Sequence, residues 1–176
     1  MNKIDRPMLL AALLVAAPAA LSQESGPVES IRNAAWELSK DYYPSSPLCA
    51  KDEITLWTCS VGEREYSLCS SRVVTRVEGY MQYRASKAGK AMFTYPTDKR
   101  PPVGLFTYTA YGNGNASVEF ANDGYRYSLM DPLRSDSSIL VEAPGGRTSE
   151  IACGGNQTLQ VNYTMRLMYE AGLWDR

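Results

Sequence analysis

The chain has 176 residues with 18 basic and 19 acidic side chains, so its formal net charge is −1. This balance argues against nucleic-acid binding, which usually needs a basic stripe, and no basic run indicates binding to a membrane surface. The absence of histidine excludes Ser-His-Asp and Cys-His catalysis.

The first 22 residues are typical of a secretory signal peptide. Basic residues precede an apolar stretch over 7–17, and small residues follow it. We expect cleavage after Ser22, or alternatively after Ala19, rather than a retained anchor, because a membrane span needs about 20 apolar residues. The remaining chain is therefore predicted to be periplasmic or secreted, with no membrane span. It divides into an N-terminal helix and linker over 23–47 and a single β domain over 48–176.

An amphipathic helix is predicted over Val28–Tyr42. Its apolar positions are Ile31, Ala35, Leu38 and Tyr42, which recur at helical spacing. The prolines that follow cannot lie inside a helix and should end it. We expect this helix to pack on the β domain, with docking of a partner as the alternative.

A β-hairpin is predicted over Ile54–Ser70, where two alternating apolar runs flank a short turn. If Gly62 and Glu63 form a two-residue turn, the register is fixed. Trp57 then lies opposite Leu68, and Cys59 lies opposite Tyr66. These four side chains share one face, which we expect to be the core face.

The four cysteines, Cys49, Cys59, Cys69 and Cys153, predict two disulfides in an exported chain. A metal site is disfavoured, because the cysteines lack the paired spacing of zinc ligands. A Cys59–Cys69 bond is also disfavoured: the two residues face opposite ways or, with a three-residue turn, lie diagonally at about 7–8 Å. If the faces of Cys59 and Cys153 both point inward, the pairs are Cys59–Cys153 and Cys49–Cys69.

Short alternating segments continue along the chain, separated by Gly, Pro and Asn. The expected strands are Glu78–Ala85, Ala91–Tyr95, Val103–Tyr111, Ser117–Ala121, Tyr125–Met130, Ile139–Glu142 and Thr148–Cys153. A type I′ turn is predicted at Asn122-Asp123-Gly124. Such a series of short strands predicts a mainly β fold, an antiparallel β-sandwich or small barrel of about eight or nine strands.

The segment Gln157–Glu170 fits both strand alternation and a helical spacing. Its length favours a short C-terminal helix, which Asn156 could cap and Gly172 could end.

No motif in the sequence indicates catalysis, and we expect no catalytic, cofactor or metal site. The glycine-rich segments 112–115 and 145–147 do not fit a phosphate-binding loop and are predicted to be hairpin turns. Paired carboxylates could hydrolyse glycosidic bonds, but no pair stands out. The candidates are Glu119, Asp123, Asp131, Asp136, Glu142 and Glu150.

Tyrosine is abundant, with 12 residues against three phenylalanines. Buried tyrosines contribute to cores, and exposed ones are favoured at interfaces. The best candidate for a binding surface is the group Tyr108, Tyr111, Tyr125, Arg126 and Tyr127.

Several segments together resemble a group of small exported proteobacterial proteins without an assigned activity. These segments are LWTCSVGEREYSLCSS, GYMQYRAS, AMFTYP and ASVEFANDGYRYSLMDPL, followed by SEIAC, and the resemblance covers about Cys49 to Leu167. It implies an exported β domain. The architecture is also similar to that of periplasmic lysozyme inhibitors, by analogy only.

These observations favour a non-enzymatic exported binding domain for a protein or envelope ligand. The alternatives are a periplasmic inhibitor or immunity protein against a cell-wall hydrolase, with 112–115 or 97–102 as the inhibitory loop, and a carboxylate-based hydrolase.

Overall fold

A computed structural model describes residues 28–154 and 158–175 of the chain. The predicted signal peptide over 1–22 and the predicted cap Asn156 lie outside the described residues.

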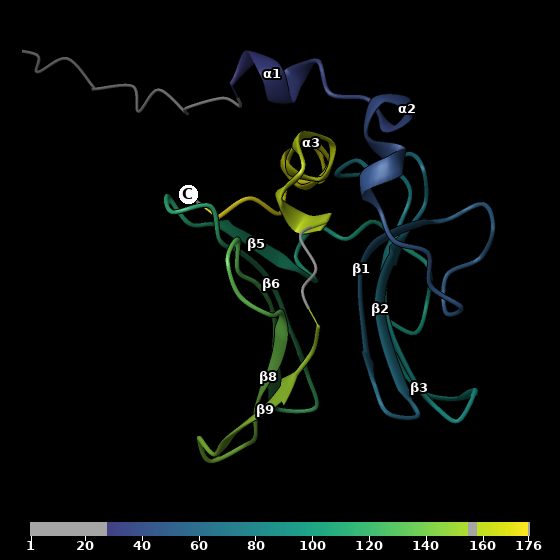
Figure 1. Ribbon diagram of the computed structural model, residues 1–176, viewed down its shortest axis with the longest axis vertical. Helices are drawn as coiled ribbons and strands as arrows, with labels where there is room; N and C mark the ends of the chain where they lie inside the picture. Colours follow the sequence, from purple (N-terminus) through teal and green to yellow (C-terminus); the bar gives the residue numbers. More distant parts are fainter. Residues whose placement is uncertain (1–27, 155–157, 176) are drawn as a thin grey trace, which may run out of the picture.

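The described strands form two antiparallel sheets, with strand orders β1-β2-β3-β4 and β5-β6-β7-β8-β9. The four-stranded sheet contains β1 (Ile54–Val61), β2 (Arg64–Ser70), β3 (Met81–Lys87) and β4 (Lys90–Tyr95). The five-stranded sheet contains β5 (Thr107–Ala110), β6 (Ala116–Asn122), β7 (Tyr125–Asp131), β8 (Ser138–Glu142) and β9 (Thr148–Ala152). The sheets face one another (Figure 1) and no described strand of one pairs with the other, so the predicted mainly β fold is confirmed as a sandwich.

Aromatic side chains join the two sheets across the core. Tyr83 of β3 lies 5.0 Å from Phe120 of β6, measured between ring centroids. Phe93 of β4 stacks on Tyr127 of β7 at 5.6 Å, and Tyr127 also stacks at 4.7 Å on Phe120, its neighbour in the same sheet. Stacked and edge-on pairs of this kind each add about 0.5–1.5 kcal/mol beyond the burial of their area.

The first hairpin has the predicted register, with Trp57 opposite Leu68 and Cys59 opposite Tyr66. All four side chains are buried. Gly62 has a φ of +60°, a conformation that glycine adopts at little steric cost. The alternation of the sequence and the two-residue turn were therefore sufficient to orient this hairpin.

Both predicted disulfides are present. Cys49 and Cys69 are bonded, with their Cα atoms 5.5 Å apart. Cys59 and Cys153 are bonded across the sandwich, with their Cα atoms 5.3 Å apart, and tie β1 to the segment that follows β9. Because Cys59 faces the core while Cys69 faces away from it, each cysteine of the hairpin reaches a different part of the chain.

The segment Val28–Tyr42 was predicted to form one continuous helix, and this prediction is wrong: the structure has separate helical turns. They are α1 (Glu29–Arg32), α2 (Trp36–Ser39) and the 3₁₀ turn η1 (Lys40–Tyr42). Ala35 is extended, with φ −133° and ψ 151°. The Ala34 carbonyl accepts a hydrogen bond of 2.6 Å from Arg166 Nη1, and Trp36 packs 4.8 Å from Tyr43. These tertiary contacts prevail over the weak preference for a continuous helix.

The C-terminal helix is confirmed, in two pieces that lie across one end of the sandwich (Figure 1). They are the 3₁₀ turn η2 (Thr158–Gln160) and α3 (Asn162–Glu170). Gly172, with φ +71°, ends the helix as predicted and turns the chain so that Leu173–Asp175 pairs with Tyr108 of β5. No helix among the described residues is long and apolar enough to cross a membrane.

The strand expected over Val103–Tyr111 is shorter than predicted. The Leu105 N–H donates to the Pro102 carbonyl, and Gly104 has a φ of +76°, so this part of the chain turns before β5 begins. The predicted type I′ turn between β6 and β7 is present, because Asp123 and Gly124 both have positive φ.

Candidate functional site

The five residues predicted as a binding surface do not form one exposed cluster. Tyr108 is 1% exposed, and its hydroxyl donates to the Leu159 carbonyl at 3.0 Å. Tyr127 is half-buried in the aromatic contacts between the sheets. Tyr111 and Tyr125 are each 41% exposed, but they lie at opposite ends of β6. Arg126 is exposed and belongs to a different feature of the surface.

That feature is a shallow hollow of about 280 Å³, which we call the β6–β7 hollow. It is lined by Gly104, Leu105, Thr107, Glu119, Phe120, Ala121 and Arg126. In the sheet register, Thr107 lies opposite Glu119, and Ala121 lies opposite Arg126. Strand alternation therefore gathers these four side chains on the face of the five-stranded sheet that points away from the core.

Two opposite charges line this hollow without being joined to each other. Glu119 is half-buried, and its side chain makes no ion pair or hydrogen bond with another described residue. Arg126 approaches Glu142 at 3.7 Å, with side chains 64% and 44% exposed, respectively. An exposed pair of this kind contributes only about 0–1 kcal/mol. Both charges can therefore interact with a ligand at small cost.

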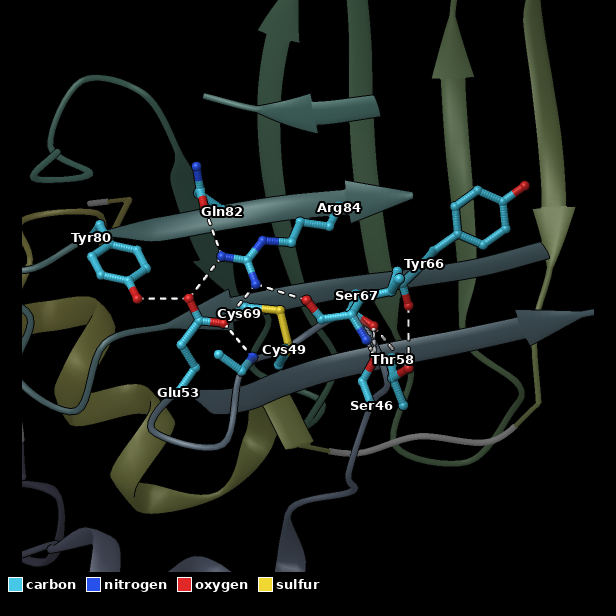
Figure 2. The surroundings of a disulfide bond; sticks show 12 residues. Ser46, Cys49, Glu53, Thr58, Tyr66, Ser67, Cys69, Tyr80, Gln82 and Arg84 are labelled. Atoms are coloured by element: carbon cyan, nitrogen blue, oxygen red, sulfur yellow. Dashed lines mark hydrogen bonds and ion pairs between the residues drawn. A yellow bond between two sulfur atoms is a disulfide. The ribbon is translucent and has the colours of Figure 1, made fainter. Parts of the chain in front are cut away.

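A second polar cluster lies beside the Cys49–Cys69 disulfide, on the outer face of the four-stranded sheet (Figure 2). At its centre is Glu53, whose side chain is 1% exposed. Arg84 donates to both carboxylate oxygens, at 2.6 and 2.7 Å, and the Tyr80 hydroxyl donates to one of them at 2.6 Å. Arg84 also donates to the side-chain oxygen of Gln82 and to the Leu48 carbonyl.

The surroundings of Glu53 keep it ionised. Burial raises the pKa of this carboxyl, but hydrogen bonds from Arg84, from Tyr80 and from the Ala50 N–H outweigh burial and lower the pKa to about 2. A carboxylate whose oxygens are already occupied in this way is a poor proton acceptor. Its geometry fits the attachment of 46–53 to the sheet better than it fits catalysis.

This cluster was not predicted, although the sequence contains a signal for it. Once Cys49 is bonded to Cys69 on the outer face, the outward residues of the next strand must face the same segment. Gln82 pairs with Cys69, and Arg84 pairs with Ser67 two residues away on β2. The side chain of Arg84 is only 16% exposed, and a buried cation needs an acidic partner, which Glu53 supplies.

One group of described residues has a metal-like spacing, with ligand atoms of Cys49, Glu53 and Cys69 within 4.8 Å of one another. The two sulfur atoms are joined in a disulfide, which offers no thiolate to a metal ion. We therefore do not interpret this group as a metal site.

A third polar group surrounds Asp131, the last residue of β7. Its side chain is fully buried and accepts hydrogen bonds from Ser137 Oγ at 2.8 Å and from the Leu159 N–H at 3.2 Å. Burial raises the pKa of this carboxyl to about 6, and the two hydrogen bonds offset only part of the effect. Glu53 lies just before β1 of the four-stranded sheet and Asp131 ends β7 of the five-stranded sheet, so these two described carboxyls do not form a catalytic pair.

Replacing Asp131 should change how stability depends on pH. The pKa of Asp131 is raised from 3.8 to about 6 in the folded state, so its contribution to stability is fully present below pH 3.8 and is lost as pH rises through 6. Between pH 3.8 and pH 6, this group should lower the unfolding free energy of the wild type by about 3 kcal/mol. The Asp131→Asn variant should not show this decrease. Urea denaturation at several pH values measures the difference.

The matched control is Asp123→Asn, which changes an exposed carboxyl in a turn whose positive φ suits asparagine. This control should keep the wild-type dependence on pH. An Asp131→Asn variant with the same slope as the wild type would contradict the role assigned to burial.

Comparison with known proteins found no matching family model, no matching curated protein and no matching solved structure.

Proposed function

We propose that this protein is a non-enzymatic exported domain that binds a protein or envelope ligand at the β6–β7 hollow. The observation that carries the proposal is the pair of opposite charges, Glu119 and Arg126, that line the hollow without a tight ion pair. Interfaces use such charges for specificity because each must find a complementary group when water is removed.

Two features support an exported location. The two disulfides are typical of an oxidising compartment, and disulfides are rare in proteins of the cytosol. The basic and apolar start of the chain fits a secretory signal peptide.

A second candidate function is inhibition of a cell-wall hydrolase by the loop between β5 and β6. Tyr111 and the following residues are exposed, while the loop is held at its base because Asn115 Oδ1 accepts a hydrogen bond from the Leu133 N–H. A preorganised protruding loop is a suitable element for occupying a cleft. The other loop considered, 97–102, is less suitable because Lys99 in its middle donates to the Tyr80 hydroxyl and lies 3.3 Å from Glu53, which holds this part of the loop against the four-stranded sheet.

The third expectation, a carboxylate-based hydrolase, has less support. A glycosidase needs two carboxyls that flank one bond. Glu53 is occupied by Arg84 and Tyr80, and Asp131 is buried on the other sheet.

A binding experiment with two defined probes tests the proposal. The exported, oxidised protein is mixed with purified peptidoglycan sacculi in a co-sedimentation assay and with lysozyme in a cell-lysis inhibition assay. We expect binding to at least one probe, and we expect Glu119→Ala/Arg126→Ala to weaken it at least about tenfold, because charged contacts are lost.

The matched control is Arg147→Ala/Glu150→Ala, which removes the same charge types from exposed positions near the free edge of β9. This control should bind as the wild type does. Binding that both double variants retain equally would contradict a role for the hollow, and loss of lysozyme inhibition only in Tyr111→Ala would favour the loop instead.

A further inference from the structure

The two charged residues of the β6–β7 hollow are diagonal neighbours in the sheet. Glu119 lies opposite Ser128, and Arg126 lies opposite Ala121, two residues further along each strand. Diagonal neighbours have Cα atoms about 7–8 Å apart, close enough for long side chains to meet. Nevertheless, Arg126 approaches Glu142 and leaves Glu119 without an ion pair among the described residues. The surface between the two charges is formed by the exposed small side chain of Ala121.

This arrangement restricts the charge of a ligand that occupies the hollow. A purely cationic ligand would pair with Glu119 and be repelled by Arg126. A purely anionic ligand would pair with Arg126 and be repelled by Glu119. A ligand with one positive and one negative group can satisfy both residues. Arginine also matches the two oxygens of a carboxylate in a bidentate geometry.

The size of the hollow and its other lining residues restrict the class of ligand further. The hollow is shallow, and its volume of about 280 Å³ is sufficient for a small molecule that rests on the surface of the sheet. Leu105 contributes a half-buried apolar side chain, and Thr107 contributes an exposed hydroxyl. A short zwitterion with one apolar group therefore matches the charges and the lining together.

We propose that the β6–β7 hollow binds a zwitterionic α-amino acid with an apolar side chain. The ammonium group lies at Glu119, the carboxylate lies at Arg126, and the apolar side chain rests against Leu105. This proposal concerns the same hollow as the proposed function and goes beyond it, because a free amino acid is a small solute rather than a protein or envelope ligand. Because Glu142 competes for Arg126 at 3.7 Å, removing the charge of Glu142 should favour the ligand.

L-leucine is the probe, and two blocked analogues are its controls. N-acetyl-leucine lacks the ammonium group, and leucinamide lacks the carboxylate. In NMR titrations of the exported, oxidised protein, we expect leucine to bind and each analogue to bind at least about tenfold more weakly, because each loses one charged contact. The amide signals of residues 119, 121 and 126 should shift.

Variants assign each charge to its partner. Glu119→Gln should bind leucine and N-acetyl-leucine equally, because it no longer recognises the ammonium group. Arg126→Gln should bind leucine and leucinamide equally. Glu142→Gln should bind leucine as tightly as the wild type or more tightly, and Glu150→Gln, an exposed change on β9, should leave the affinity unchanged.

The inference is overturned if leucine causes no shift at these amides up to about 10 mM, or if leucine and both analogues bind alike. Circular dichroism confirms that each variant is folded before its affinity is interpreted. If leucine fails while binding to sacculi or lysozyme still depends on Glu119 and Arg126, the amino-acid ligand is excluded and the proposed function stands. If leucine binds while neither sacculi nor lysozyme does, the amino-acid ligand is supported and the proposed function is excluded.

Discussion

Removal of the Cys59–Cys153 disulfide should lower the free energy of unfolding by about 4–5 kcal/mol. The two cysteines are 94 residues apart in the chain, so the bond restricts a large part of the unfolded ensemble. Both residues are buried, at 3% and 6% exposure, so the Cys59→Ala/Cys153→Ala variant introduces no unpaired polar group. The measurement is urea denaturation of the oxidised protein, followed by tryptophan fluorescence.

The second disulfide provides the comparison. Cys49 and Cys69 are only 20 residues apart, and chain entropy predicts a loss of about 3 kcal/mol in Cys49→Ala/Cys69→Ala. If the Cys59–Cys153 variant unfolded within about 1 kcal/mol of the wild type, restriction of the unfolded chain could not be the main contribution of this bond.

The disulfides and the first hairpin could be predicted because their sequence signals are local. Strand alternation has a period of two, so the Gly62-Glu63 turn determined the faces on which Cys59 and Cys69 lie. An even number of cysteines then left few compatible pairings. The same logic located the Asp123-Gly124 turn, where two successive residues need positive φ.

Features that depend on contacts between distant elements could not be predicted in this way. Tyr108 is an example: the segment Leu173–Asp175 pairs with its backbone, and the Leu159 carbonyl accepts a hydrogen bond from its hydroxyl. The break in the N-terminal helix depends on Arg166, far along the chain, binding the Ala34 carbonyl. Tertiary contacts of this kind override local propensity without leaving a local signal.

One residue of the candidate site was also named from the sequence. Arg126 was among the expected residues, and the hollow that it lines is present. Glu119 was named only among the carboxylates considered for catalysis, and its position beside Thr107 on the outer face agrees with strand alternation. The grouping of these residues into a hollow also requires the turn over 102–105, which shortens β5 and could not be read from an apparently continuous alternating segment.

Replacement of Glu53 by glutamine should have the other large effect on stability. The substitution leaves Arg84, which is 16% exposed, without its carboxylate, and breaking a buried pair in this way typically costs about 3–5 kcal/mol. The pKa of Glu53 is lowered from 4.5 to about 2, so its contribution is present above pH 4.5 and is lost as pH falls toward 2. We therefore expect a loss of about 3 kcal/mol at pH 7 that shrinks progressively toward pH 2, measured by urea denaturation.

Two further variants separate the buried pair from the exposed charge beside it. Lys99 lies 3.3 Å from Glu53 with a side chain that is 54% exposed, so Lys99→Ala should cost only about 0–1 kcal/mol. In Glu53→Gln/Arg84→Met the uncompensated cation is gone, and most of the stability lost in Glu53→Gln should return.

A Glu53→Gln variant that is equally destabilised at pH 2 and pH 7 would show that the cluster requires the shape of this side chain rather than its charge. The expected dependence on pH would instead show that an ionised Glu53 holds the segment 46–53, together with the Cys49–Cys69 disulfide, against the outer face of the sheet.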